Sequence, residues 1–450
     1  MDVKDTKKSQ SRPQVESFLD GLRTFLTPAI WKRVEKARGC RRRSPRWTCQ
    51  PLMLTLLAMT WCCGDSQAER FETAKGFTTV CLNKRRRPGR SVQGFQLALA
   101  RLPTRVLREL AAGIRQRLLA VLDFSSGGFI AFGCDGSSME TPWIPELEKR
   151  LDPPLKKRAR PQVWVTALVH LRTGVLWAWR LGKGYNRERS HLRMLLTTLP
   201  ATALVVTDAG YYGYELAQAI NRAGVSFLIR VLGDQKLYTE NQVAVKEFEE
   251  GEVFLWPNDI QKKKLPPLRA RLIHIKADNK RKGVWLLTNV LETERLPASI
   301  AARYYRWRWE NEGLFRTFKR TLSKVRLLSR TVREIHREAE GALLATQLLL
   351  AQGTRATQSC QKATTPQRCS PRKVLLAIRA VLMGKIGIHQ KEAFHRRMAA
   401  ARREQRQRLT SKVSRPWPRY VKHRPLKPPI LLMLTPEQKA LKDQLLGIAA

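Results

Sequence analysis

Apolar residues recur at helical spacing through the first quarter of the chain. From about residue 15 to residue 123 this spacing predicts several helices, one that opens at Pro51 and another that runs from Val106 toward Leu119. Short basic stretches separate the predicted helices. The pattern therefore predicts a helical region at 1–124 with positively charged joints.

The pattern changes to that of strands after a Ser-Ser-Gly-Gly sequence at 125–128. Residues 129–135 form a short apolar run that ends in the carboxylate of Asp135, which predicts a buried strand ending there. Residues 162–171 and 175–180 flank a Gly-containing turn and predict a β-hairpin. The elements expected next are a helix at about 189–198, a strand at 203–207 that ends at Asp208, a helix at 214–223 and a strand at 226–231.

The predicted order is strand, strand, strand, helix, strand, helix, strand. This order is that of a ribonuclease H-like domain, an α/β fold with a mixed sheet and flanking helices. In that fold the first and fourth strands lie side by side. We therefore expect the carboxylates of Asp135 and Asp208 to converge at one edge of the sheet.

The remaining chain alternates between strand-like and helical patterns. Pieces at 271–275 and 284–288 predict a β-rich insertion, and 298–322 predicts one long helix without an internal Pro. Ser370 followed by Pro predicts the start of a further helix. The expected organisation is a helical region at 1–124, a catalytic domain in two parts at 125–233 and 297–352, a β-rich insertion at 234–296, and a basic, partly helical region at 353–450.

The charge of the chain favours a polyanionic partner. Lys and Arg total 84 against 37 Asp and Glu, which gives a net charge of +47. The longest apolar run, at 52–63, is too short to cross a bilayer, so nucleic acid is a better partner than a membrane surface. A purely binding protein without catalysis would also explain this charge.

The first residues and the cysteines indicate a cytoplasmic protein. The N-terminal segment lacks the apolar stretch of a signal peptide. The eight cysteines are spaced irregularly, without a CxxC pair, and are typical of reduced residues. Cys134, beside Asp135, is expected to be a small strand residue and not a catalytic thiolate.

The predicted long helix carries a stripe of functional groups. On a helical wheel Tyr305, Arg308, Glu312 and Lys319 fall within an arc of roughly 60°. The apolar residues of the same helix, Trp307, Leu314 and Phe318, cluster on another arc and are expected to face the core. A solvated face with an ion pair between Arg308 and Glu312 is the simpler interpretation, but it does not account for two strand-ending aspartates upstream.

A resemblance to a known family favours the functional interpretation. The bacterial insertion-sequence transposases with a DDE catalytic domain share a Y-R-E-K signature, which this chain resembles at Tyr305, Arg308, Glu312 and Lys319. The sequences that begin at Asp135 and at Asp208 resemble the family's two aspartate motifs. The resemblance covers roughly residues 125–350.

The resemblance implies a transposase that cuts DNA at the ends of its element and joins them to target DNA. Asp135, Asp208 and Glu312 are then the catalytic residues and the ligands of two Mg²⁺ ions, for which Mn²⁺ could substitute. Such ions prefer carboxylate oxygens, and two of them about 3.5–4 Å apart activate the attacking group and stabilise the leaving oxygen. Tyr305, Arg308 and Lys319 would contact phosphates, and Tyr305 is not expected to act as a nucleophile.

Two further residues are candidates for DNA contact. Arg230 ends a predicted strand and could meet DNA, although a surface salt bridge suits it nearly as well. Trp285 in the insertion could stack on an unpaired base, whereas an ordinary core tryptophan is the more common occurrence.

The expected partner is double-stranded DNA, as element ends and as target. Because both ends of an element must be joined together, we expect a homodimer assembled on DNA, at the nucleoid of a bacterial cytoplasm. A stand-alone nuclease on the same fold is the alternative enzyme.

Overall fold

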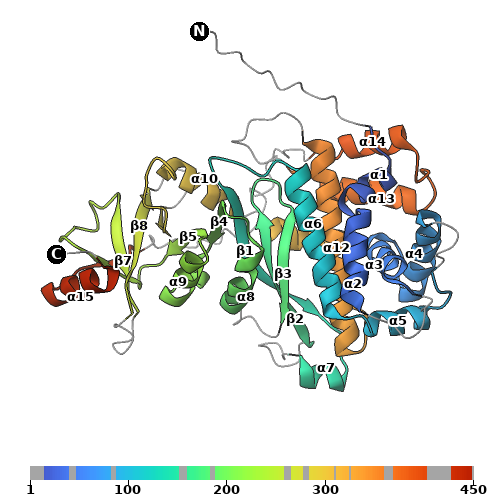
Figure 1. Ribbon diagram of the computed structural model, residues 1–450, viewed down its shortest axis with the longest axis horizontal. Helices are drawn as coiled ribbons and strands as arrows, with labels where there is room; N and C mark the ends of the chain where they lie inside the picture. The colour runs from blue at the N-terminus through green and yellow to red at the C-terminus, as the bar shows by residue number, and fades with distance from the viewer. Residues whose placement is uncertain are drawn as a thin grey trace, which may run out of the picture. The chain divides into compact units, whose positions relative to one another are not determined.

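The computed structural model describes residues 15–39, 47–82, 88–151, 160–182, 188–257, 265–276, 283–308, 311–323, 326–358, 368–402 and 427–447. These residues form an α/β structure with one large mixed sheet and many helices (Figure 1). The chain divides into two compact units. A helical unit comprises Met1–Leu122, Thr317–Cys360 and Gln367–Arg403, and a sheet unit comprises Asp123–Arg316, Gln361–Pro366 and Glu404–Ala450.

The helical unit is organised around one long helix. Its elements are α1 (Phe18–Phe25), α2 (Pro28–Arg38), α3 (Cys49–Trp61), α4 (Gln67–Cys81), α5 (Val92–Ala100), α6 (Thr104–Val121), the π-helical turn η5 (Thr317–Thr321), α12 (Val332–Thr357), α13 (Pro371–Leu382) and α14 (Lys391–Ala399). Helix α12 contacts α3, α5, α6 and α13 (Figure 1). The buried Arg337 of α12 donates to the Leu102 carbonyl at 2.7 Å, which ties α12 to the start of α6. Residues 317–352, which the sequence assigned to the catalytic domain, thus group with the helical unit.

Local capping explains where several of these helices begin. Ser17 with Asp20 and Ser66 with Glu69 form reciprocal capping boxes at α1 and α4. Ser370 caps α13, and a Pro occupies the first helical position, as its sequence predicted. None of the helices in the described ranges is long and apolar enough to cross a membrane.

The sheet unit contains ten strands in the order β10-β6-β7-β8-β9-β5-β4-β1-β2-β3. The strands are β1 (Ile130–Glu140), β2 (Gln162–His170), β3 (Leu176–Gly182), β4 (Ala203–Thr207), β5 (Ser226–Val231), β6 (Lys236–Thr239), β7 (Glu250–Leu255), β8 (Leu268–Ile275), β9 (Val284–Thr288) and β10 (Ile430–Met433). The helical elements are α7 (Pro145–Arg150), α8 (Glu188–Leu195), η2 (Leu196–Thr198), η3 (Ala209–Tyr211), α9 (Tyr214–Arg222), α10 (Ala298–Arg308), α11 (Asn311–Arg316) and α15 (Pro436–Leu446). Strand β1 pairs parallel with β4 and antiparallel with β2.

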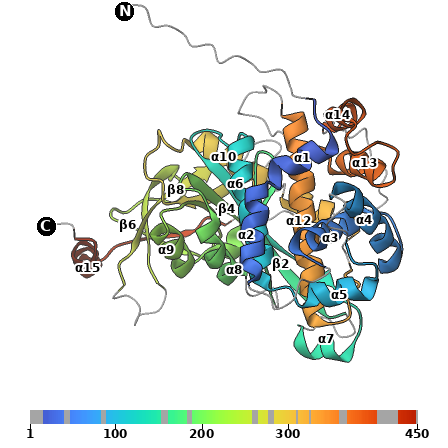
Figure 2. The ribbon, with the colours of Figure 1, turned by 45° about the vertical axis from the view of Figure 1, so that its right-hand side comes forward.

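The two faces of the sheet are covered by different helices. One buried cluster joins Ala131 of β1 and two alternate residues of β4 to helix α10; its members from β4 and α10 are Leu204, Val206, Tyr304, Tyr305 and Trp307. The helices α8 and α9 contact strands β2, β3, β5 and β8, and Figure 2 shows α9 beside the sheet. Successive side chains of a strand point to opposite faces of the sheet. Odd-numbered residues of β1 therefore face α10, and even-numbered residues face α8.

Two predicted boundaries are corrected by the structure. Strand β1 does not end at Asp135 but continues to Glu140, because its antiparallel partner β2 pairs with it as far as Gln162. Within the predicted helix at 298–322, residues 298–308 (α10) and 311–316 (α11) are helical and residues 309–310 lie outside the described ranges, but residues 317–321 form the π-helical turn η5 instead of continuing the α-helix. A π turn changes the angular step per residue, so the wheel that placed Lys319 with Glu312 does not apply across it.

A helix contact inside the helical unit can be tested directly. A Cβ built on Gly341 of α12 would lie 2.5 Å from Leu56 Cγ, whereas one on Gly76 of α4 would meet nothing within 4 Å. Gly341→Ala should lower the free energy of unfolding by about 1–3 kcal/mol through overpacking. Gly76→Ala, the matched control, should raise it by up to about 1 kcal/mol because Ala favours helix. Urea unfolding of both variants measures this, and a stabilised Gly341→Ala protein would contradict the close packing.

Candidate active site

Asp135 and Asp208 occupy equivalent positions on neighbouring parallel strands. The β1–β4 register pairs Gly133 with Val206, so both aspartates lie two residues further along. Asp135 shares the parity of Ala131, and Asp208 that of Val206, both of which are in the core cluster with α10. The two carboxylates therefore lie on the α10 face of the sheet, side by side.

Backbone N–H groups fix each aspartate within its own segment. The Gly136 N–H donates to Asp135 Oδ1 at 2.8 Å, and the Gly210 N–H donates to Asp208 Oδ1 at 3.0 Å. The second bond makes Asp208 the cap of η3, which turns the chain away from the sheet. The end of β4 at Asp208 thus follows from this local cap.

Glu312 approaches the two aspartates from helix α11, which contacts β1. Its side chain is exposed. Burial raises the pKa of Asp135, and the charges of Asp208 and Glu312 raise it further, while the Gly136 N–H and the Arg308 guanidinium oppose the rise in pKa. The charges that act on Asp135 therefore include the other two predicted carboxylates, Asp208 and Glu312, and one predicted cation, Arg308.

The donor chemistry of this group fits a hard divalent cation. Carboxylate oxygens are the ligands such ions prefer, and a cation would stabilise the ionised form of Asp135, which burial and the charges of Asp208 and Glu312 disfavour. Among the described residues no three His, Cys, Asp or Glu side chains converge closely enough to hold an ion in this arrangement. Glu312 is the exposed member of the three, whereas Asp135 and Asp208 are half-buried.

The basic members of the signature occupy different environments. The Arg308 guanidinium lies over the Tyr305 ring, 5.3 Å from its centroid, and Tyr305 is only 8% exposed. Lys319 is half-buried in η5, within the helical unit. Trp307, Leu314 and Phe318 are buried, in agreement with the predicted apolar arc.

The two further candidates for DNA contact, Arg230 and Trp285, lie on strands β5 and β9. Arg230 of β5 is half-buried and pairs opposite Leu286 of β9. Trp285 is 5% exposed, and its ring stacks on that of His274 with the centroids 4.0 Å apart. Trp285 therefore lies where a core tryptophan would, which was one of the two interpretations that the sequence allowed.

Sequence reasoning missed one carboxylate, Glu188, the first residue of α8. Its pKa is raised by burial and by the charges of Asp135 and Asp208, and it accepts a hydrogen bond from Tyr211. The only linear signal is an acidic residue at the start of the helix after the third strand, which is an ordinary helix-start preference. Cys134 is buried with a raised pKa, so it remains a thiol, as expected.

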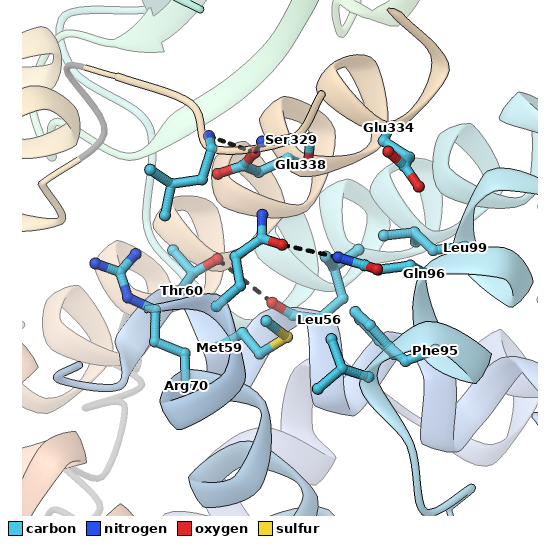
Figure 3. A pocket seen from close by; sticks show the side chains of 13 residues that line it. Leu56, Met59, Thr60, Arg70, Phe95, Gln96, Leu99, Ser329, Glu334 and Glu338 are labelled. Carbon is cyan, nitrogen blue, oxygen red and sulfur yellow. Dashed lines mark hydrogen bonds between the residues drawn. The ribbon is translucent and has the colours of Figure 1, made fainter. Parts of the chain in front are cut away.

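The helical unit contains a small cavity between α3, α5 and α12 (Figure 3). Leu56, Met59 and Phe95 contribute apolar surface, and Glu338 stands at its edge. The Glu338 carboxylate accepts the backbone N–H groups of both Leu328 and Ser329 at 2.9 Å, which is a structural role. With about 50 Å³ of room, the cavity suits a few water molecules and not a nucleotide.

Comparison with known proteins identifies the family that this chain resembles. The family described as "Transposase DDE domain" matches residues 134–348, which include Asp135, Asp208 and Glu312. The transposase InsG for insertion sequence element IS4 of Escherichia coli (strain K12) is 27% identical over 316 residues, 67% of this chain and 70% of that protein. The chain is a DDE-type DNA transposase. The predicted class of enzyme is thereby confirmed.

A solved structure also resembles this transposase along most of its length. The cryo-EM structure of the piggyBac transposase synaptic complex with hairpin DNA matches 90% of this chain and 89% of that chain. The TM-score is 0.41 and the sequence identity is 11%.

The raised pKa of Asp135 has a consequence for stability. A carboxyl whose pKa is higher in the folded state costs stability once it ionises, so the cost is absent below pH 3.8 and complete above the folded pKa. Asp135→Asn keeps the acceptor for the Gly136 N–H and removes the charge. In metal-free buffer it should stabilise the transposase by about 0.5–2 kcal/mol at pH 7, and by little at pH 3.8, the unfolded pKa. Urea unfolding at both pH values measures the gain, and a destabilised variant at pH 7 would contradict the cost assigned to burying the Asp135 charge beside Asp208 and Glu312.

Proposed function

We propose that this transposase cuts DNA strands at the ends of its element and joins them to target DNA in one active site. Asp135, Asp208 and Glu312 form that site on a ribonuclease H-like sheet, with residues 234–296 as an insertion. The observation that carries the proposal is the shared register and face of Asp135 and Asp208 opposite the α10–α11 segment. The reaction takes place at the nucleoid, in the cytoplasm, where the DNA is.

The three carboxylates would hold two Mg²⁺ ions, or Mn²⁺ in their place. When bound, these ions supply a nucleophile at neutral pH and stabilise the leaving oxygen. The protein's own contribution is to fix the oxygen donors before any ion arrives. Backbone N–H groups orient the two aspartates, and the half-buried position of Asp135 limits competition from water.

The cationic residues would grip the DNA backbone around this centre. Arg308 already balances part of the negative charge at Asp135, and its planar guanidinium can donate to phosphate oxygens. Tyr305, packed beneath Arg308, orients that group, and Lys319 and Arg230 supply further charge. The basic helical region at 1–124 and the basic C-terminal region would bind the element ends and the target. Their contacts would position the DNA without reading every base.

Neutralising each carboxylate tests the chemistry. Asp135→Ala, Asp208→Ala and Glu312→Ala should each reduce cleavage of end DNA in Mg²⁺ to background, at least about a thousandfold, because each removes an oxygen donor. DNA binding should stay within about twofold of wild type. Gel assays of cleavage and filter binding measure the two properties.

The matched control for this test is Glu140→Ala. Glu140 ends the same strand as Asp135, and its strand parity puts it on the opposite face of the sheet. This variant should cleave like the wild type. Cleavage by a purified Asp135, Asp208 or Glu312 variant at wild-type rate would remove that residue from the site.

We also propose that the active species is a homodimer assembled on two element ends. One active site handles one end, and moving an element requires both. A net charge of +47 opposes association of the free protein, and DNA would neutralise it.

Light scattering with and without end DNA tests this assembly. We expect a monomer alone and two chains per complex with DNA, with affinity that falls steeply as salt rises. A complex that cleaves and joins both ends with one protein chain would contradict the dimer.

A further inference from the structure

Glu188 lies against β1 on the face opposite to Asp135. Strand parity puts Cys134 and Gly136 on the face that α8 covers. A Cβ built on Gly136 would overlap Glu188 Oε1 and would lie 2.6 Å from the indole nitrogen of Trp164. The Glu188 carboxylate therefore occupies the space that any side chain at position 136 would fill, directly next to Asp135.

A buried row of hydrogen bonds connects Glu188 with both aspartate segments. The Cys134 thiol donates to the Tyr211 hydroxyl, with Sγ and Oη 3.6 Å apart, and the Tyr211 hydroxyl donates to the Glu188 carboxylate. Burial raises the pKa of Cys134 and of Tyr211, so both keep their protons and donate at neutral pH. Cys134 immediately precedes Asp135, and Tyr211 lies in the turn that Asp208 caps.

Helix α8 is itself anchored to both sides of this row. His191 Nδ1 and Thr166 Oγ1 are 2.8 Å apart, and Thr166 pairs with Gly136 in the β1–β2 ladder. Arg189 Nε donates to the Gly210 carbonyl at 2.8 Å. Gly210 is also the residue whose N–H binds the Asp208 carboxylate. The first turn of α8 thus fixes the strand that carries Asp135 and the turn that carries Asp208.

We propose that Glu188 is a positioning residue that, through Tyr211, holds the Asp208 turn level with Asp135 before metal ions bind. The proposal rests on the metal site proposed above. A carboxylate suits this task because a charge-assisted hydrogen bond to a buried hydroxyl is roughly twice as strong as a neutral one. Residues behind metal ligands that orient them in this way commonly change metal affinity by about 10- to 100-fold. Gly136 permits the contact because it leaves room for the carboxylate.

The experiment uses the full chain and Mn²⁺ alone as the probe. Mn²⁺ affinity is measured by isothermal titration calorimetry, and amide hydrogen exchange is measured across residues 208–212. Glu188→Ala and Tyr211→Phe should each weaken Mn²⁺ binding about tenfold or more and speed exchange at Gly210. They should also raise the Mg²⁺ concentration that gives half-maximal cleavage. The double variant should bind Mn²⁺ no more weakly than Glu188→Ala alone, because Glu188→Ala already removes the hydrogen bond that Tyr211 makes to Glu188.

Two further variants serve as controls. Glu188→Gln keeps an oxygen that accepts from Tyr211, so its Mn²⁺ affinity should stay within about threefold of wild type. Glu215→Ala removes an exposed ion pair that joins α9 to Arg193 of the same helix α8, and it should behave like wild type.

Each outcome decides the proposal. Unchanged Mn²⁺ affinity and exchange in Tyr211→Phe, which removes a single oxygen atom, would overturn it even if Glu188→Ala failed to fold. An equal loss in Glu188→Gln and Glu188→Ala would also overturn it, because the charge and not the hydrogen bond would then act on the ions. Failure of the underlying metal site is distinguishable, since Asp135→Ala and Asp208→Ala would then bind Mn²⁺ like wild type.

Discussion

The sheet unit depends on holding like charges beside one another away from bulk water. Asp135 and Asp208 lie on one face of the β1–β4 pair and Glu188 on the other, and burial first, then the charges of neighbouring carboxylates, raise the pKa values of Asp135 and Glu188. A fold can keep such groups together only if the segments that carry them cannot separate. Parallel pairing, the cap at η3 and the anchored first turn of α8 provide that restraint.

Much of the sheet could be predicted from local sequence. Strand β4 coincides with its apolar run, because all its residues are buried and Asp208 ends it with a cap. The β2–β3 hairpin follows from its turn, where Gly174 adopts a φ of 72°. These features are encoded within a few residues, so pattern reasoning found them.

Features set by partners distant in sequence were not predictable. The length of β1 depends on how far its partner β2 extends, and the residues around Asp135 carry no local signal of where that pairing ends. The π-helical turn and the grouping of α12 with the N-terminal helices depend on packing in the helical unit. Of the proposed site, the two aspartates could be singled out from the sequence because each follows an apolar run. Glu188 was missed because its role arises from contact with Gly136 and Tyr211, far away in sequence.

Strand β10 gives the sheet an unusual order of completion. It pairs parallel with β6, and Leu432 follows Thr239 by 193 residues. The helix α15 then packs beside it, with Lys442 paired to Glu240. During synthesis, the outer edge of β6 emerges from the ribosome long before the strand that covers it. Nascent or prematurely terminated chains therefore expose an unpaired strand edge, the kind of surface on which aggregation and chaperone capture begin.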